Sequence, residues 1–250
     1  MEIATSIDEV INHLTLIIDA EVSRKSHLAF FPVLYKKVTE RIKLGIQNKE
    51  FEDNERMERL DVIFASRYLR AYQEWKAGTR PSESWERAFH APENDQLIIM
   101  QDLLLGINAH INLDLGIAAA QTVDNFEELQ ALKNDFNKIN EILNDMVDGV
   151  QNRISEVSPI FYLLEKVGKG KEDELVSFSI NIARDGAWLF ANEYCLSPDE
   201  EKTILNRDII ISHLAERLVS PRSRLLRWTI RSIRFFEVKN VKRIAKVLGS

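Results

Sequence analysis

The sequence predicts an all-α fold: a single compact domain of about nine or ten helices around a buried central helix. Three observations lead to this prediction. Apolar residues recur at steps of three and four along most of the chain, whereas the alternation typical of strands does not occur. Helix-capping residues precede many of these segments. The 250 residues include only 9 Gly and 6 Pro and are 45% hydrophobic, which allows a sizeable core.

Each helix is predicted from an apolar stripe together with its flanking signals. The expected helices cover residues 6–22, 32–47, 54–78, 82–90, 92–122, 124–155, a shorter helix from 159, 172–194, 197–219 and a terminal helix from 221. Capping or first-turn residues support most starts: Ser6, Asn54, Pro92, Asp124 or Asn125, Pro159, Ser197, and Ser220 with Pro221. The segments AGTRPS and GKGKED separate neighbouring helices as polar breaks.

The central helix carries the most informative segment, LLLGINAHINLDLGIAAA at residues 103–120. His110 and Asp114 are four residues apart and share one face, while Asn108 and Asn112 form a second pair roughly 160° round the helix. Burial of these groups in an apolar run costs several kcal/mol unless each finds a partner. The segment therefore predicts either a polar network that orders the core or a functional site.

Two further buried charges are expected near this helix. Asp61 lies on the apolar stripe of the third helix, where it is either a structural ion pair or cap, or a metal ligand or general base. Arg184 precedes Trp188 by four residues in ARDGAW and is the natural counter-ion for Asp61 or Asp114. Such a pair would balance the charges without a metal, and would favour a structural network or recognition of an anionic ligand by Arg184.

Three motifs, AHINLDL, DFNKINEIL and ARDGAW, resemble those of a bacterial family known as domain of unknown function 5995. The resemblance covers most of the chain. It implies a shared helical fold and no particular activity. The centre it implies contains His110, Asn112, Asp114, Asn140, Arg184 and Trp188.

A weaker similarity concerns the spacing of His110 and Asp114. It is similar to the helical His-x-x-x-Asp of zinc-dependent phospholipase C and the related single-strand nucleases, which are also all-α. Those families use several more histidines and an N-terminal Trp, whereas this chain has five His and begins with Met-Glu. Their trinuclear zinc site is therefore not expected here.

Other features limit the function classes. The chain lacks His-Glu-x-x-His, Gly-x-Ser-x-Gly and Gly-x-x-x-x-Gly-Lys, and its one cysteine, Cys195, cannot form an internal disulfide. The first residues, MEIATSIDEV, carry acids where a signal peptide has a basic region. We therefore predict a cytoplasmic protein.

The last thirty residues carry the strongest charge asymmetry. Residues 221–250 contain nine Lys or Arg and one acid, Glu237, which gives a net charge of +8. The whole chain has a net charge of −6, so residues 1–220 carry −14. A basic amphipathic helix is expected here, with its arginines at Arg224, Arg227, Arg231 and Arg234. We expect it to pack on the domain through its apolar residues: Leu225, Leu226, Trp228, Ile230, Ile233, Phe235 and Phe236. An anionic membrane surface is the alternative partner, and the acidic body argues against nucleic acid.

These observations lead to two hypotheses about function. The first is a buried pocket that binds a small molecule or hydrolyses an ester or phosphoester. Its catalytic residues would be His110, Asp114 and Asp61, which could hold one divalent metal. Its ligand-binding residues would be Asn112, Asn140, Arg184 and Trp188. The second is a non-enzymatic interaction protein, or a peripheral membrane protein that uses residues 221–250.

Overall fold

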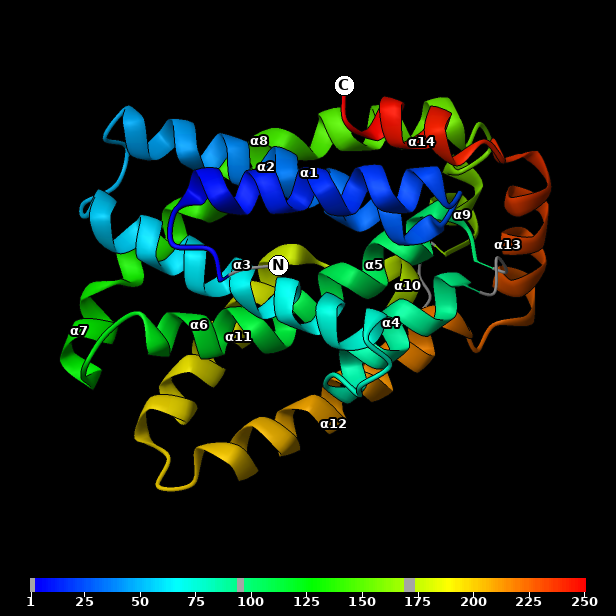
Figure 1. Ribbon diagram of the computed structural model, residues 1–250. Coiled ribbons are helices and arrows are strands. Elements are labelled where there is room, and N and C mark those ends of the chain that lie inside the picture. The colour runs from blue at the N-terminus through cyan, green and yellow to red at the C-terminus, as the bar shows by residue number, and fades with distance from the viewer. Residues whose placement is uncertain (1–2, 94–96, 169–173) are drawn as a thin grey trace.

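A computed structural model describes residues 3–93, 97–168 and 174–250, and these residues form helices without any strand. Figure 1 shows the arrangement. The helices are α1 (Ile7–Ser23), η1 (His27–Ala29), α2 (Phe30–Gln47), α3 (Asn54–Lys76), α4 (Glu83–Glu93), α5 (Ile99–Ala109), η2 (His110–Asp114), α6 (Leu115–Gln121), α7 (Phe126–Ala131), α8 (Lys133–Val157), α9 (Tyr162–Gly168), α10 (Glu174–Ser177), α11 (Ile180–Leu196), α12 (Glu200–Val219), α13 (Arg224–Phe236) and α14 (Val241–Leu248). The all-α prediction is confirmed.

The number of helices is larger than predicted. With α5, η2 and α6 counted as one continuous rod, the described residues form thirteen α-helices rather than nine or ten. The expected helix over 124–155 is divided at Leu132 into α7 and α8, and the terminal helix is divided after Phe236 because Asn240 caps a new helix, α14. The expected helix over 172–194 becomes α10 and α11, and its first two residues lie outside the described part.

Pro92 was expected to open the central helix but lies in the last turn of α4. A proline cannot continue a helix without losing a backbone hydrogen bond, so its place close to the end of α4 fits the break that follows. The central rod begins only at Ile99, after a segment that includes residues 94–96 outside the described part. Ser6 and Asn125 cap α1 and α7 as expected, whereas α3, α12 and α13 are capped by Asp53, Asp199 and Ser223 instead of Asn54, Ser197 and Ser220.

The rod Ile99–Gln121 lies in the middle of the molecule, in contact with α2, α3, α4, α11 and α12. It is the one helix in the described residues that is long and apolar enough to cross a membrane, and 94% of its most apolar window is buried inside the protein. A core helix meets the same criterion of length and composition, so this finding is weak evidence for a membrane span. The prediction of a buried central helix is confirmed.

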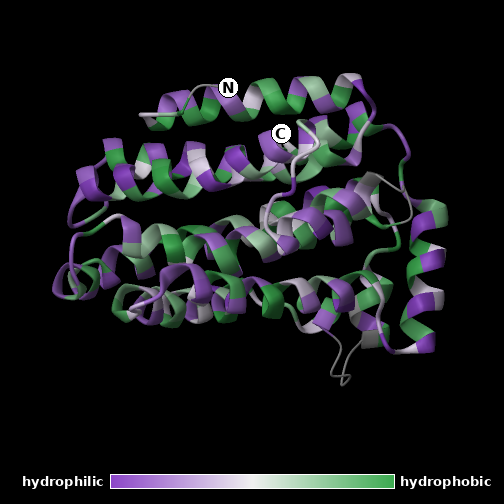
Figure 2. Cartoon of the chain, turned by 60° about the horizontal axis from the view of Figure 1, so that its bottom comes forward, coloured by the Kyte–Doolittle hydropathy of each residue, from purple (hydrophilic) through white to green (hydrophobic). Residues whose placement is uncertain are grey.

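The C-terminal helices join the main core only in part. Leu226, Ile230 and Ile233 of α13 are buried against the body, and α14 packs beside α2 and α8. The expectation that all large apolar residues of this segment are covered is wrong for four of them. The exposed four are Leu225, Trp228, Phe235 and Phe236. Figure 2 shows hydrophobic and hydrophilic residues side by side on this helix at the edge of the molecule.

The rod comes close to the backbone of α11 at Gly116. A Cβ at this position would lie 2.7 Å from the backbone oxygen of Ala187 and 2.8 Å from the ring of Phe190. Glycine is needed here for close approach of two helices, since backbone on the α11 side cannot move aside.

We therefore expect Gly116→Ala to lower the free energy of unfolding by about 1–3 kcal/mol, the usual cost of overpacking. Chemical denaturation followed by circular dichroism measures this change. Gly186→Ala on α11 is the matched control, because its new methyl would meet only the flexible end of Arg207, at 3.4 Å. This control should be neutral or more stable, by up to about 1 kcal/mol. Equal stability of the two variants would contradict the proposed close packing.

Candidate functional site

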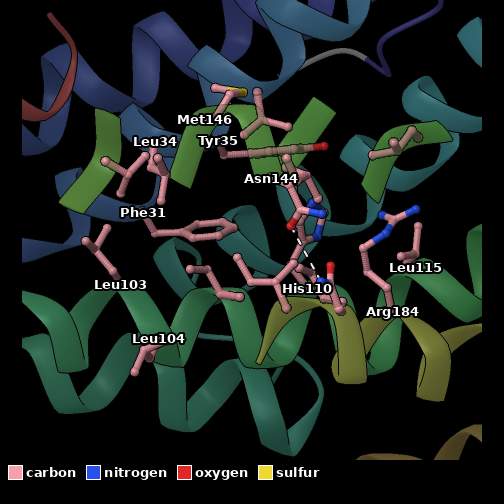
Figure 3. Close-up of a pocket in the computed structure, with 18 of the residues that line it drawn as sticks. Phe31, Leu34, Tyr35, Leu103, Leu104, His110, Leu115, Asn144, Met146 and Arg184 are labelled. Atoms are coloured by element: carbon pink, nitrogen blue, oxygen red, sulfur yellow. Dashed lines mark hydrogen bonds between the residues drawn. The ribbon is translucent and has the colours of Figure 1, made fainter. Parts of the chain in front are cut away.

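A pocket of about 410 Å³ lies between α2, α3, the central rod, α8 and the start of α11. Most of its wall is apolar. One face of α2, at steps of three and four, contributes Phe31, Leu34, Tyr35, Val38 and Ile42. Figure 3 shows Phe31, Leu103 and Leu104 at one end of the pocket and Arg184 at the other, with His110 between them. A pocket of this size and character is typical of small-molecule sites.

His110 is the first residue of a π-helical turn within the central rod. The π turn covers His110–Asp114, and the backbone N–H of Leu115 donates to the carbonyl of His110, five residues earlier. Such turns are rare and occur frequently at functional sites. The extra residue in this turn changes the direction of the side chains on the pocket side. The apolar periodicity of the sequence predicts a regular α-helix here and does not reveal this change.

The imidazole of His110 is buried among aromatic rings. Its ring stacks on Phe64 with a centroid distance of 3.6 Å and meets the edge of Tyr35 at 4.4 Å. Phe31 also contacts it, and occupies the space that Gly106 leaves open. Neither ring nitrogen has a hydrogen-bond partner among the described residues, and Nδ1 lies 3.6 Å from Asp114 Oδ2, beyond hydrogen-bond distance. Burial lowers the pKa of His110, so the ring is neutral at neutral pH, with one donor and one acceptor.

Asp61 and Tyr35 share the wall with His110. The prediction that Asp61 lies on the buried face of its helix is confirmed, and its Oδ2 has no hydrogen-bond partner. Burial raises the pKa of Asp61 to about 7, and the nearby charge of Glu58 acts in the same direction. The hydroxyl of Tyr35 also lacks a partner, and burial raises the pKa of this phenol well above its usual range. Among the described residues, three polar side chains that each have at least one unpartnered atom therefore line one apolar pocket.

Asp114 does not belong to this pocket. Its carboxylate accepts hydrogen bonds from Arg67 Nε at 2.8 Å and from Trp85 Nε1 at 2.7 Å. Burial opposes its charge, but Arg67, His110 and Trp85 together outweigh this effect and hold the pKa of Asp114 below its usual value. Asp114 is thus an ionised structural residue that links the rod to α3 and α4, and not a group free for catalysis.

Arg184 was expected to pair with Asp61 or Asp114, and this is wrong. Its guanidinium donates to Asn140 Oδ1 and to the backbone oxygen of Phe136, and it lies 4.5 Å from the ring of Phe136. Arg67 takes the expected place beside Asp114. Burial lowers the pKa of Arg184 to about 9. Arg184 lines the pocket, and in the part of the chain that the structure describes its guanidinium bonds to an amide and a backbone oxygen rather than to a carboxylate.

The remaining candidate residues lie away from the pocket. Asn112 donates to Asn108 Oδ1 on the same helix, while its backbone oxygen accepts from Arg207 of α12. Trp188 packs on Phe136 at a centroid distance of 4.9 Å and is not among the residues that line the pocket. Asn140 acts through Arg184 and does not line the pocket. The structure therefore brings together His110, Asp61 and Arg184 of the seven predicted residues.

The divalent metal considered for His110, Asp114 and Asp61 is not supported by their placement. In the part of the chain that the structure describes, no group of three or more His, Cys, Asp or Glu is arranged to hold a metal ion. Asp114 has its oxygens engaged by Arg67 and Trp85, so the three residues do not form a ligand set.

Tyr35, Phe64 and Arg67 are site or supporting residues that sequence reasoning missed. Phe64 and Arg67 lie three and six residues after Asp61, on neighbouring turns of the same helix. Phe64 shares the face of Asp61 at this spacing, whereas Arg67 lies about 120° round the helix, so the spacing could have placed only Phe64 beside Asp61. Nothing in the local sequence distinguishes Tyr35 from the other apolar and aromatic residues of its stripe.

The raised pKa of Asp61 generates a prediction about stability. The folded state keeps a proton that the unfolded state releases between about pH 4 and pH 7, so ionisation of this residue opposes folding as pH rises. Asp61→Asn removes this effect. The difference in free energy of unfolding between Asp61→Asn and the wild type should therefore change by about 2–3 kcal/mol in favour of the variant from about pH 5 to pH 8.

Urea denaturation of both proteins at the two pH values measures this difference, and other titrating groups cancel because they are common to both. Asp19→Asn, on the exposed surface of α1, controls for the loss of one charge. An Asp61→Asn profile parallel to that of the wild type would show that Asp61 ionises normally in the folded protein.

Comparison with known proteins was made for the whole chain. No curated protein and no solved structure matched it, and the weaker similarity to zinc-dependent phospholipase C is not shown. A family model, described as "Family of unknown function (DUF5995)", matches residues 7–221. This range includes α1 to α12, and with them every wall of the pocket. The chain therefore belongs to the DUF5995 family.

Proposed function

We propose that this protein binds a small, predominantly apolar molecule in the pocket beside His110. The observation that carries the proposal is the set of unpartnered polar atoms on the pocket wall: Tyr35 Oη, Asp61 Oδ2 and both ring nitrogens of His110. Buried polar atoms without partners are rare in native proteins, since each costs about 1–3 kcal/mol. A ligand with a polar group would supply the missing hydrogen bonds and cover the apolar wall.

The protonation states of these groups describe the ligand further. Tyr35 stays protonated and neutral His110 offers one donor and one acceptor. Asp61, with a pKa of about 7, can donate when protonated. A hydroxyl, carbonyl or carboxyl group fits such a set. The guanidinium of Arg184 on the opposite side disfavours a cationic ligand.

Ester or phosphoester hydrolysis is less well supported. Within the described residues, no hydroxyl or thiol is hydrogen-bonded to His110, which would be the pattern of an activated nucleophile. Ser179 lines the pocket, but its hydroxyl accepts the N–H of Ile182 as the cap of α11. Binding is therefore the function that the arrangement supports best.

Titration with Nile red, a neutral apolar dye, tests the proposal. We expect saturable binding of one dye per chain, displaced by 1-decanol. Leu143→Trp places a larger side chain into the pocket and should abolish dye binding while the helical spectrum is kept. Leu205→Trp, on an exposed position of α12, is the matched control and should bind as the wild type does. No saturable binding by the wild type would overturn the proposal.

Tyr35→Phe separates the polar contact from the apolar one. It removes one buried hydroxyl that has no partner, so the free energy of unfolding without ligand should stay the same or rise. Affinity for 1-decanol should fall about 2- to 10-fold, the equivalent of one lost hydrogen bond, while affinity for decane is unchanged. Dye displacement measures both ligands. Equal loss for decanol and decane would show that Tyr35 only shapes the pocket.

A further inference from the structure

Helix α13 exposes a second apolar surface that the body of the protein does not cover. Trp228 is 66% exposed and Phe235 is 79% exposed, and Leu225 and Phe236 are more than half exposed. At about 100° per residue, these four side chains fall within one sector of about 100°. The buried residues Leu226, Ile230 and Ile233 occupy the opposite side of the helix. We call the exposed set of Leu225, Trp228, Phe235 and Phe236 the outer face of α13.

Arginines border the outer face on one side. Arg224, Arg227 and Arg231 are exposed on the adjoining sector, and the guanidinium carbon of Arg231 lies 5.7 Å from the centre of the Trp228 ring. Farther along the chain, α14 exposes Lys242, Arg243 and Lys246. Arginines thus accompany the large apolar side chains of α13, and the next helix along the chain exposes further cations.

The position of α13 in the fold leaves this edge accessible. The helix runs across the end of the bundle, at the margin of the molecule in both views (Figures 1 and 2), and it packs mainly on α9. Residues 221–250 carry a net +8 and the rest of the chain −14. A negatively charged surface would therefore attract this end of the protein and repel the rest.

We propose that α13 docks on the surface of an anionic lipid bilayer. Trp and Phe side chains prefer the headgroup region, where their rings leave water and remain near polar groups, and arginines beside them bind lipid phosphates. The outer face supplies the first set and Arg224 and Arg231 supply the second. This helix lies beyond residue 221, where the family match ends, so docking is a property of this chain in addition to its family pocket.

Vesicle co-sedimentation with the full chain tests the proposal. We expect binding to vesicles of phosphatidylcholine and phosphatidylglycerol, weaker binding to phosphatidylcholine alone, and loss of the difference at high salt. Trp228 is the most exposed of the four tryptophans, so its fluorescence should shift to shorter wavelength on binding.

Two pairs of substitutions separate the contributions. Trp228→Ser with Phe235→Ser should reduce partition onto anionic vesicles by at least about tenfold without a change in melting temperature, because both side chains are exposed. Arg224→Gln with Arg231→Gln should reduce it by about fivefold per charge and leave binding to phosphatidylcholine unchanged. Leu16→Ser with Leu205→Ser, on exposed positions of α1 and α12, is the matched control and should change nothing.

Two results would overturn the proposal. One is wild-type protein that stays in the supernatant with anionic vesicles. The other is a dimer in sedimentation analysis that Trp228→Ser with Phe235→Ser converts to a monomer, which would show that a second copy covers the outer face.

Discussion

The ion pair between Asp114 and Arg67 is the interaction on which the rest of this structure depends. Asp114 sits near the middle of the central rod, Arg67 belongs to α3, and Trp85 of α4 donates to the same carboxylate. Removal of one partner from a buried pair leaves an uncompensated charge and costs about 3–5 kcal/mol. The pair therefore holds the π turn in one position relative to two helices, and through it the ring of His110.

The other buried polar groups of the rod have a similar structural role. Gln101 donates to the backbone oxygens of Leu218 and Val219, and Asn108 donates to that of Ile211, so both attach the rod to α12. Since these groups are satisfied within the protein, they explain the polar residues in the central segment without a ligand. His110 is the exception, because its ring nitrogens have no hydrogen-bond partner among the described residues. This difference distinguishes the candidate site from the polar residues that only support the fold. The unpartnered atoms in the pocket lower the stability of the unliganded protein, a cost that native proteins often carry at functional sites.

The periodicity of apolar residues was sufficient to predict the helical class, the buried rod, and the burial of Asp61 and His110. It could not predict the breaks at Leu132 and after Phe236, because short helices depend on tertiary contacts more than on local propensity. It also misassigned the partner of Asp114. Both Arg67 and Arg184 lie on helices that contact the rod, and only their position in three dimensions decides which of them reaches the carboxylate. The pocket itself is a space left between five helices, and no single segment encodes it.

The π turn has a consequence for how this family can vary in length. A π turn contains one residue more than the α-helical turn it replaces, so deletion of one residue within His110–Asp114 would restore a regular helix. The four residues of a regular α-helical turn span about the same rotation as the five of the π turn, so the two halves of the rod would keep nearly the same orientation to each other. Gly116 would then still face Ala187, and the close approach of the rod to α11 would be kept. The rod should therefore tolerate the loss of one residue within His110–Asp114, whereas loss of one residue from the regular turns of α5 or α6 would turn one part of the rod by about 100° relative to the other.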